Sequence, residues 1–185
     1  MIDEIIEKTI QKMDKTIVNL SSEFATIRTG RASAAMLERI LVDYYGTPTP
    51  VTQLAGIQTP EAHMLLVSPW DKQAHDGIVK AIQASDLGIT PSSDGSIIRL
   101  PFPPPTEERR RELVKQCRQL AEDCKVAVRN ERRDANTRLD RLVKEDDYSK
   151  DDVKRAQDQV QKITDNHIVQ IDEVLKVKEA EVMEV

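Results

Sequence analysis

Residues 106–144 read TEERRRELVKQCRQLAEDCKVAVRNERRDANTRLDRLVK and contain neither proline nor glycine. An uninterrupted helix of about 38 residues would be about 57 Å long. Thr106 is a good N-cap, and the two glutamates that follow it suit the positive end of a helix dipole. At about 100° per residue, the apolar side chains gather on one face; they include Leu113, Cys117, Leu120, Cys124, Ala127, Val128, Ala135, Leu139 and Leu142. The stretch predicts a long helix that packs against other helices.

Two further stretches carry the same kind of apolar face. Residues 2–28 also lack proline and glycine, and their apolar residues follow steps of four and three from Ile6 to Ile27. That spacing is typical of helix-on-helix packing, and we expect Gly30 to cap the helix. A third helix is predicted from about Lys150 to near the C-terminus, after a polar break at 145–148. Three such helices bury their apolar faces most simply against one another.

The segment between the first two helices has a different composition. Residues 31–105 contain all 9 prolines and 5 of the 6 glycines. Short apolar runs predict strands, a helix is expected within residues 71–85, and a turn at 44–48; the runs lie at residues 40–42, 63–67 and 96–100. We expect Trp70 to be a packing residue of this segment. The predicted fold class is α+β: a long three-helix bundle from residues 1–30 and 105–185, discontinuous in sequence, with a small mixed β/α/β domain, residues 31–104, inserted.

The chain passes between these two predicted domains twice, which suggests a hinge. One connection is Thr29-Gly30-Arg31 and the other is Pro104-Pro105-Thr106. Glycine permits backbone angles that other residues resist, and consecutive prolines form a stiff, extended connector. We therefore predict that the two domains move as rigid bodies about these residues.

Charge is unevenly distributed along the chain. The net charge is −5, yet residues 106–144 carry 12 basic and 8 acidic groups. Basic side chains project to one face of the predicted helix; they are Arg111, Lys115, Arg118, Lys125, Arg129, Arg132 and Arg133. Such a face is often merely solvated. However, no acid stands four residues after Arg129 or Arg132, and arginine suits phosphate recognition. A phosphate-bearing partner is the alternative interpretation.

No catalytic pattern is visible in the sequence. It has no phosphate-binding glycine loop, no paired-cysteine motif and no His-Glu-x-x-His helix, and its three histidines are dispersed. We expect no metal, no cofactor and no enzymatic activity. No apolar run approaches the roughly 18 residues of a membrane span, and no signal peptide is visible. Cys117 and Cys124 are expected to be buried hydrophobic residues in a reducing cytosol.

Two polar residues fall on apolar stripes. Glu131 projects to the centre of the stripe, where its carboxylate must reach the surface or pair with a cation such as Arg138. If it is buried without such help, Glu131→Val should stabilise the protein by roughly 1–3 kcal/mol. His167 lies on the stripe of the third helix, and we expect a packed histidine there rather than a metal ligand.

Several strings, in this order and spacing, resemble the bacterial ribosome recycling factor family over essentially the whole chain. They are IRTGRA at 27–32, YYGTP at 44–48, ASDLG at 84–88, TEERR at 106–110, VAVRN at 126–130 and RRDAN at 132–136. The resemblance implies a three-helix bundle that bears a smaller β/α/β domain on a flexible double hinge, an L shape like that of tRNA. This agrees with the interpretation of the residues given above.

The resemblance also implies a function. Such a factor binds the ribosome after termination, with its bundle on large-subunit ribosomal RNA. Elongation factor G then hydrolyses GTP and pushes on the small domain, so that the subunits separate. The family's RNA-contacting arginines map onto Arg110, Arg129 and Arg132, and Lys125 and Arg133 of the basic face join them as candidates. We expect a cytoplasmic monomer that needs no cofactor and contacts no membrane.

Without the resemblance, the main rival is a coiled-coil interaction protein such as an adaptor or a co-chaperone, and an enzyme comes third. A ribosome binder should show a strongly salt-dependent affinity for ribosomes, which would separate it from the adaptor.

Overall fold

The computed structural model describes residues 1–145 and 148–184. These residues form two compact units, which we call the helical unit (1–29 and 107–184) and the small unit (30–106). The units divide at 29/30 and 106/107, where the sequence suggested 30/31 and 104/105. The predicted polar break at 145–148 includes Asp146 and Asp147, which lie outside the described residues.

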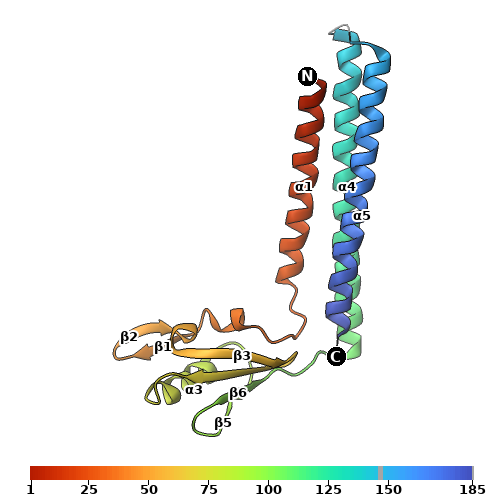
Figure 1. The fold of residues 1–185 in the computed structure, drawn as a ribbon. Helices are drawn as coiled ribbons and strands as arrows, with labels where there is room; N and C mark the ends of the chain where they lie inside the picture. The colour runs from red at the N-terminus through yellow and green to blue at the C-terminus, as the bar shows by residue number, and fades with distance from the viewer. Residues whose placement is uncertain (146–147, 185) are drawn as a thin grey trace. The chain divides into compact units, whose positions relative to one another are not determined.

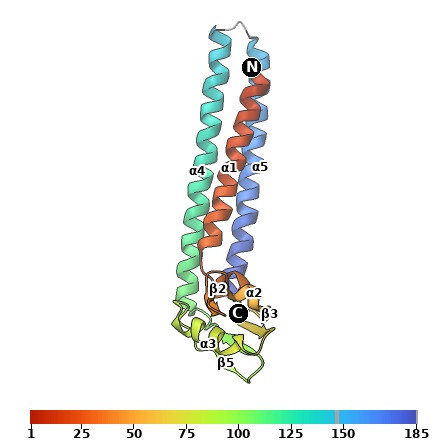
Figure 2. The same cartoon turned by 90° about the vertical axis from the view of Figure 1, so that its left-hand side faces the viewer.

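The helical unit consists of three long helices that lie side by side (Figures 1 and 2). They are α1 (Ile2–Thr26), α4 (Glu107–Glu145) and α5 (Lys150–Met183). The predicted apolar stripes form the buried core, so the α+β fold class with a three-helix bundle is confirmed. Ser149 caps α5, because its hydroxyl oxygen accepts a hydrogen bond from the backbone N–H of Asp151 at 3.2 Å. In the described part of the chain, none of the helices is both long and apolar enough to cross a membrane.

The end of α1 differs from the prediction. The helix stops at Thr26, and its C-cap residue is Ile27 in extended conformation with φ −75° and ψ 113°, so Gly30 is not the cap. The side chain of Ile27 is buried in the core of the helical unit. The free energy gained by burying this β-branched residue in an extended conformation is larger than the gain from one further helical turn.

The small unit contains two antiparallel sheets and short helices (Figure 1). The hairpin strands β1 (Leu41–Tyr44) and β2 (Thr47–Pro50) form one sheet. The other sheet has the order β3-β4-β6-β5, with β3 (Ala55–Glu61), β4 (Met64–Pro69), β5 (Ser92–Ser93) and β6 (Ile98–Pro101). Helix α3 spans Ala74–Ala84 and packs on β1, and the short helices are η1 (Ala34–Leu37) and α2 (Val51–Leu54).

The predicted strands at 40–42, 63–67 and 96–100 correspond to β1, β4 and β6. The sequence did not reveal β3, because Gly56 and Pro60 weaken its strand pattern. An edge strand tolerates proline, since one side of its backbone lacks a partner strand, and β3 lies at the edge of its sheet. Edge position therefore explains why β3 was missed; β5, which was also not predicted, is another edge strand of this sheet.

The expectation that Trp70 is a packing residue of the small unit is wrong, because the residue is 72% exposed. Alternate residues of a strand point to opposite faces. In β4, Leu65 and Val67 are fully buried, so the residues between them point away from the core. Trp70 directly follows the strand and continues the set of residues that point away from the core. Its backbone N–H donates to the Leu54 carbonyl at 3.1 Å.

The two polar residues on the apolar stripes have partners from α1. Lys12 Nζ lies 2.9 Å from Glu131 Oε2, and the Glu131 side chain is 26% exposed. The carboxylate pairs with this lysine rather than with Arg138, so Glu131→Val is not expected to stabilise the fold. His167 is buried; its Nδ1 lies 2.7 Å from the Ile163 carbonyl and its Nε2 lies 2.8 Å from Asp14 Oδ1. It is a packed histidine, as predicted.

Both cysteines are free and buried. Burial, and to a smaller extent the charge of Glu23, raises the pKa of Cys124 from its ordinary 9.0 to about 11. Thiolate, not thiol, is the reactive form. In the unfolded chain this thiol ionises at a lower pH than in the native protein. Its contribution to stability is therefore complete below pH 9.0 and is lost as the pH rises to about 11.

We therefore predict that Cys124 reacts with a thiol reagent at pH 8 about a hundredfold more slowly in the native protein than in urea, the ratio set by the two pKa values. Labelling of a Cys117→Ala variant, followed by mass spectrometry, isolates this residue. Equal rates with and without urea would show that Cys124 is not buried in solution.

Candidate functional site

In the described part of the chain, three of the seven predicted basic residues of α4 bond to side chains of α5: Arg118, Lys125 and Arg132. Arg118 Nε lies 2.6 Å from Glu179 Oε1, and Lys125 Nζ lies 2.6 Å from Asp172 Oδ1. A step of seven residues forward along α4 is thus matched by a step of seven back along α5. The same antiparallel register joins Asp140 Oδ1 to Gln157 Nε2 at 2.8 Å. Charged pairs that flank an apolar seam fix the register of packed helices.

Arg132 continues this row, but its partner is an amide. Its Nη1 donates to Gln161 Oε1 at 3.0 Å, and Gln161 Nε2 donates to Asp165 Oδ1 at 2.9 Å. Asp165 is the residue that the register would place opposite Arg132. The glutamine therefore separates the guanidinium from the nearest carboxylate of the row. Within the described part of the chain, the remaining N–H groups of Arg132 have no partner, and a guanidinium offers five donors.

Arg129 and Arg133 lie one turn apart and bond within α4. Arg129 Nη1 lies 3.1 Å from Glu122 Oε1, and its side chain is 39% exposed. Arg133 is exposed, and its Nη1 donates to Asn130 Oδ1 at 3.2 Å. The acid that neutralises Arg129 stands seven residues before it rather than four after it. Exposed pairs of this kind contribute only about 0–1 kcal/mol, so a phosphate can displace them at small cost.

Arg110 lies apart from the other four candidates. It precedes the buried residues Leu113 and Cys117 by three and seven positions, so it flanks the core side of α4. It is half-buried, and among the described residues its Nε has no hydrogen-bond partner. Lys125 follows fifteen residues later, about 22 Å along the helix. The five candidates therefore occupy three positions: Lys125 and Arg132 face α5, Arg129 and Arg133 lie farther out, and Arg110 flanks the core.

Two of the hinge candidates in the small unit, Gly30 and Pro105, lie in close contact. Gly30 has φ +77°, and a Cβ on it would lie 2.8 Å from Pro105 Cδ. Its carbonyl oxygen lies 2.9 Å from His63 Nδ1. No side chain fits between the two connections, and L-residues rarely adopt this backbone conformation. Glycine is required here for close packing of the two connections rather than for ending a helix.

The other hinge candidates differ in exposure. Thr29 is buried and Pro105 is half-buried, whereas Arg31, Pro104 and Thr106 are exposed. Ala32, directly after Arg31, donates its N–H to the Ala62 carbonyl at 2.7 Å. Regular pairing to the small unit therefore begins immediately after the first connection.

No group of three or more His, Cys, Asp or Glu residues that could hold a metal ion occurs in residues 1–145 and 148–184. His75 contacts Ser93 Oγ through Nε2 and Asp76 Oδ1 through Nδ1, the latter at 3.1 Å. In hydrolases that use a Ser-His-Asp triad, the acid is buried and orients the histidine. Here the Asp76 side chain is 90% exposed, and Ser93 Oγ also accepts the N–H of Gly95 at 3.1 Å. These contacts stabilise a turn.

Comparison with known proteins identifies close relatives. The family model described as ribosome recycling factor matches residues 20–183. The chain is 54% identical to the ribosome-recycling factor of Geobacillus kaustophilus over 185 residues, which is the whole of both chains. It is 52% identical to that of Clostridioides difficile over 182 residues, 98% of each chain.

Solved structures give the same result. A solution structure of the ribosome recycling factor has a TM-score of 0.70 and 38% identity, and the match covers 100% of this chain and 98% of that one. The T. thermophilus ribosome recycling factor, in a structure with the E. coli elongation factor G bound to the E. coli post-termination complex, has a TM-score of 0.62 and 41% identity over all of both chains. Sequence motifs, fold and full-length similarity agree, and the chain belongs to the ribosome recycling factor family.

Proposed function

We propose that this protein binds the post-termination ribosome and, together with elongation factor G, separates the subunits so that mRNA and tRNA are released. The observation that carries the proposal is the full-length similarity to a ribosome recycling factor that is described, together with elongation factor G, as bound to the post-termination complex. GTP hydrolysis belongs to elongation factor G in this scheme. The protein itself acts as a cytoplasmic, monomeric binding and mechanical factor that carries out no reaction and needs no cofactor.

The RNA-binding surface in this proposal is the basic part of α4. Arg129 and Arg132 reach the solvent near each other, and Lys125 stands one turn before Arg129. Arrays of this kind suit the phosphates of folded RNA, which proteins recognise by shape rather than by base sequence. Two features support the assignment: Gln161 holds Arg132 without neutralising it, and the buried Nε of Arg110 lacks a partner in the described chain. Arg133 adds an exposed cation beside them.

The two units are the domains of the proposed mechanism, and we assign the hinge to the residues that join them. Thr29, Gly30 and Arg31 form one connection, and Pro104, Pro105 and Thr106 form the other. Close packing of Gly30 on Pro105 supports this assignment, because neither connection can shift without the other. A paired connection of this kind restricts the possible motions to a few backbone rotations.

The direct test of the function is a subunit-splitting assay. Purified 70S post-termination complexes should dissociate when this protein, elongation factor G and GTP are all present. Omission of any one of them, or replacement of GTP by a non-hydrolysable analogue, should prevent turnover. Intact 70S particles in the complete reaction would refute the proposed function.

Arg132→Ala should weaken binding to ribosomes by about tenfold or more, equivalent to about 1.4 kcal/mol per tenfold. The lost interaction is a charged hydrogen bond to phosphate, so the salt dependence of log K should also become shallower by about 0.7–0.9. Helicity and melting temperature should stay nearly unchanged, because within the described residues the side chain of Arg132 makes one hydrogen bond, to Gln161, and no ion pair.

Arg141→Ala is the matched control for Arg132→Ala, since Arg141 is an exposed arginine of α4 outside the predicted basic face. Titrations at two salt concentrations compare the two variants with the parent. Parental affinity and salt slope in Arg132→Ala would remove the basic surface from the mechanism.

Gly30→Val should reduce subunit splitting more than ribosome binding. A left-handed conformation costs a non-glycine residue about 1–3 kcal/mol, and the new Cβ would also meet Pro105 Cδ at 2.8 Å. Gly88→Val is the control, because Gly88 has φ +67° but no neighbouring atom lies within 4 Å of the position that a Cβ would take. If the Gly30 and Gly88 variants lose splitting equally, or if Gly30→Val loses binding and splitting in parallel, the hinge role is wrong.

A further inference from the structure

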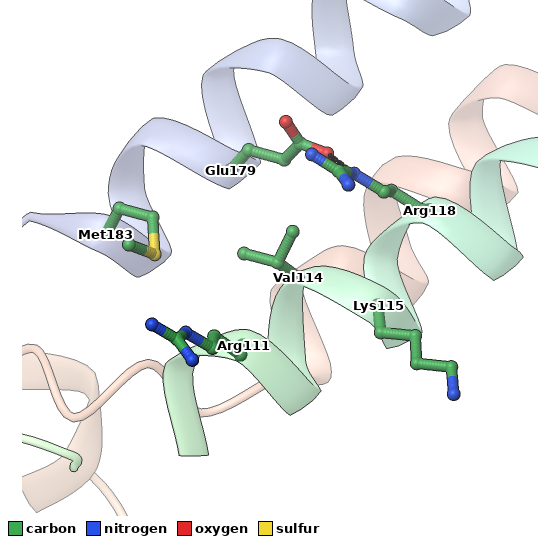
Figure 3. Close-up of a pocket in the computed structure, with 6 residues that line it drawn as sticks. All are labelled: Arg111, Val114, Lys115, Arg118, Glu179 and Met183. Carbon is green, nitrogen blue, oxygen red and sulfur yellow. Dashed lines mark hydrogen bonds and ion pairs between the residues drawn. The ribbon is translucent and has the colours of Figure 1, made fainter. Parts of the chain in front are cut away.

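A groove in the helical unit lies outside the five candidate residues of the RNA-binding surface. It opens between the N-terminal part of α4 and the last turns of α5, with a volume of about 380 Å³ (Figure 3). Its lining residues are Arg111, Val114, Lys115, Arg118, Glu179 and Met183. Ligand sites of proteins begin at about 300 Å³, so the groove has room for one small planar group.

The floor of the groove is apolar and open to solvent. Val114 is half-buried and packs on the core of the helical unit, whereas Met183 is 46% exposed. Figure 3 shows Val114 at the centre, between the two helices, and Met183 on the last turn of α5. A thioether is polarisable and makes favourable contacts with aromatic rings. Its exposure is therefore explained if a flat aromatic group covers it.

Cations surround this apolar floor. Arg111 and Arg118 have side chains 75% and 66% exposed, and Lys115 is also exposed. Glu107 pairs with Arg111 and Glu179 pairs with Arg118, while in the described chain Lys115 has no ion pair. Three cations against two carboxylates leave one positive charge at the rim of a protein whose net charge is −5. The groove therefore favours an anionic ligand.

Glu179 orients Arg118 but bonds to only one of its nitrogens in the described chain. The carboxylate accepts from Nε at 2.6 Å, so within the described residues the two Nη groups keep their N–H donors for another partner. A guanidinium held in this way offers a preformed fork to a phosphate.

We propose that this groove binds one nucleotide of RNA, with the base against Val114 and Met183 and the flanking phosphates at Arg111, Lys115 and Arg118. The inference rests on the proposed function, which supplies ribosomal RNA as the ligand, and extends the RNA-binding surface to the first three turns of α4. Contact of Val114 and Met183 with the flat face of a base does not depend on which base is bound, since every base has such a face. The site therefore strengthens binding without reading sequence.

Two variants separate the base contact from the phosphate contact in binding to isolated large ribosomal subunits. Met183→Glu should weaken binding about fivefold or more, because it removes the contact between the thioether and the base and places a carboxylate next to the phosphates. Lys115→Gln should flatten the salt dependence of log K by about 0.7–0.9. Lys15→Gln, at an exposed lysine of α1, should change neither quantity beyond the general loss of one charge. Circular dichroism confirms that each variant keeps the parent's helicity.

A photo-crosslinking residue in place of Met183 then identifies what covers the groove on the large subunit. A crosslinked product that nuclease removes supports the proposal, and one that only protease removes overturns it in favour of a protein partner. If the parent splits ribosomes while Met183→Glu and Lys115→Gln bind as the parent does, the groove is not a nucleotide site and the proposed function stands. If the parent neither binds nor splits ribosomes, both inferences fall.

Discussion

The antiparallel register between α4 and α5 is the constraint on which the helical unit depends. It buries one apolar stripe from each helix and simultaneously places Lys125 opposite Asp172 and Arg118 opposite Glu179. A slip of one residue would rotate every side chain by about 100°, so the stripes would leave the core and the charged pairs would separate. An exposed pair such as Arg118–Glu179 adds little stability by itself; the effect of the charged pairs is to select one register among several that apolar contacts alone would allow.

The same register determines what the cations of α4 can do. Residues 145–185 are strongly acidic, with 12 acidic and 6 basic groups, and α5 brings several of these acids against α4. Lys125 becomes a largely internal partner whose side chain is 17% exposed, whereas Gln161 interrupts the row of acids and leaves Arg132 its charge. A phosphate ligand must therefore compete with a carboxylate of α5 for Lys125, whereas at Arg132 it would replace only an uncharged amide. Charge that is locally available, rather than the net charge of −5, governs binding.

In the small unit, the corresponding constraint is steric. The hairpin β1–β2 and the four-stranded sheet enclose one apolar core, and the two connections to the rest of the chain meet where Gly30 packs on Pro105. Hydrogen bonds secure both connections to the same corner: Ala32 donates to Ala62, and Phe102 donates to His63, each at 2.7 Å. Regular structure therefore extends up to the connections, so the rotation in the proposed hinge would be confined to the few residues between the last of these bonds and the long helices.

The sequence by itself determined the three helices, their buried stripes and the inserted small domain, because helical periodicity and the confinement of proline to one segment are local properties. It also identified the family, whereas the RNA-binding role of the arginines of α4 is our proposal. The partners of those side chains were decided only by tertiary structure. Lys12 reaches Glu131 from α1, and Asp172 reaches Lys125 from α5; such pairs join residues far apart in the chain, and a projection of one helix contains no information about them. For the same reason Trp70 was placed wrongly and the edge strand β3 was missed: burial and strand pairing depend on which neighbours the fold supplies, and the sequence near each residue does not specify them.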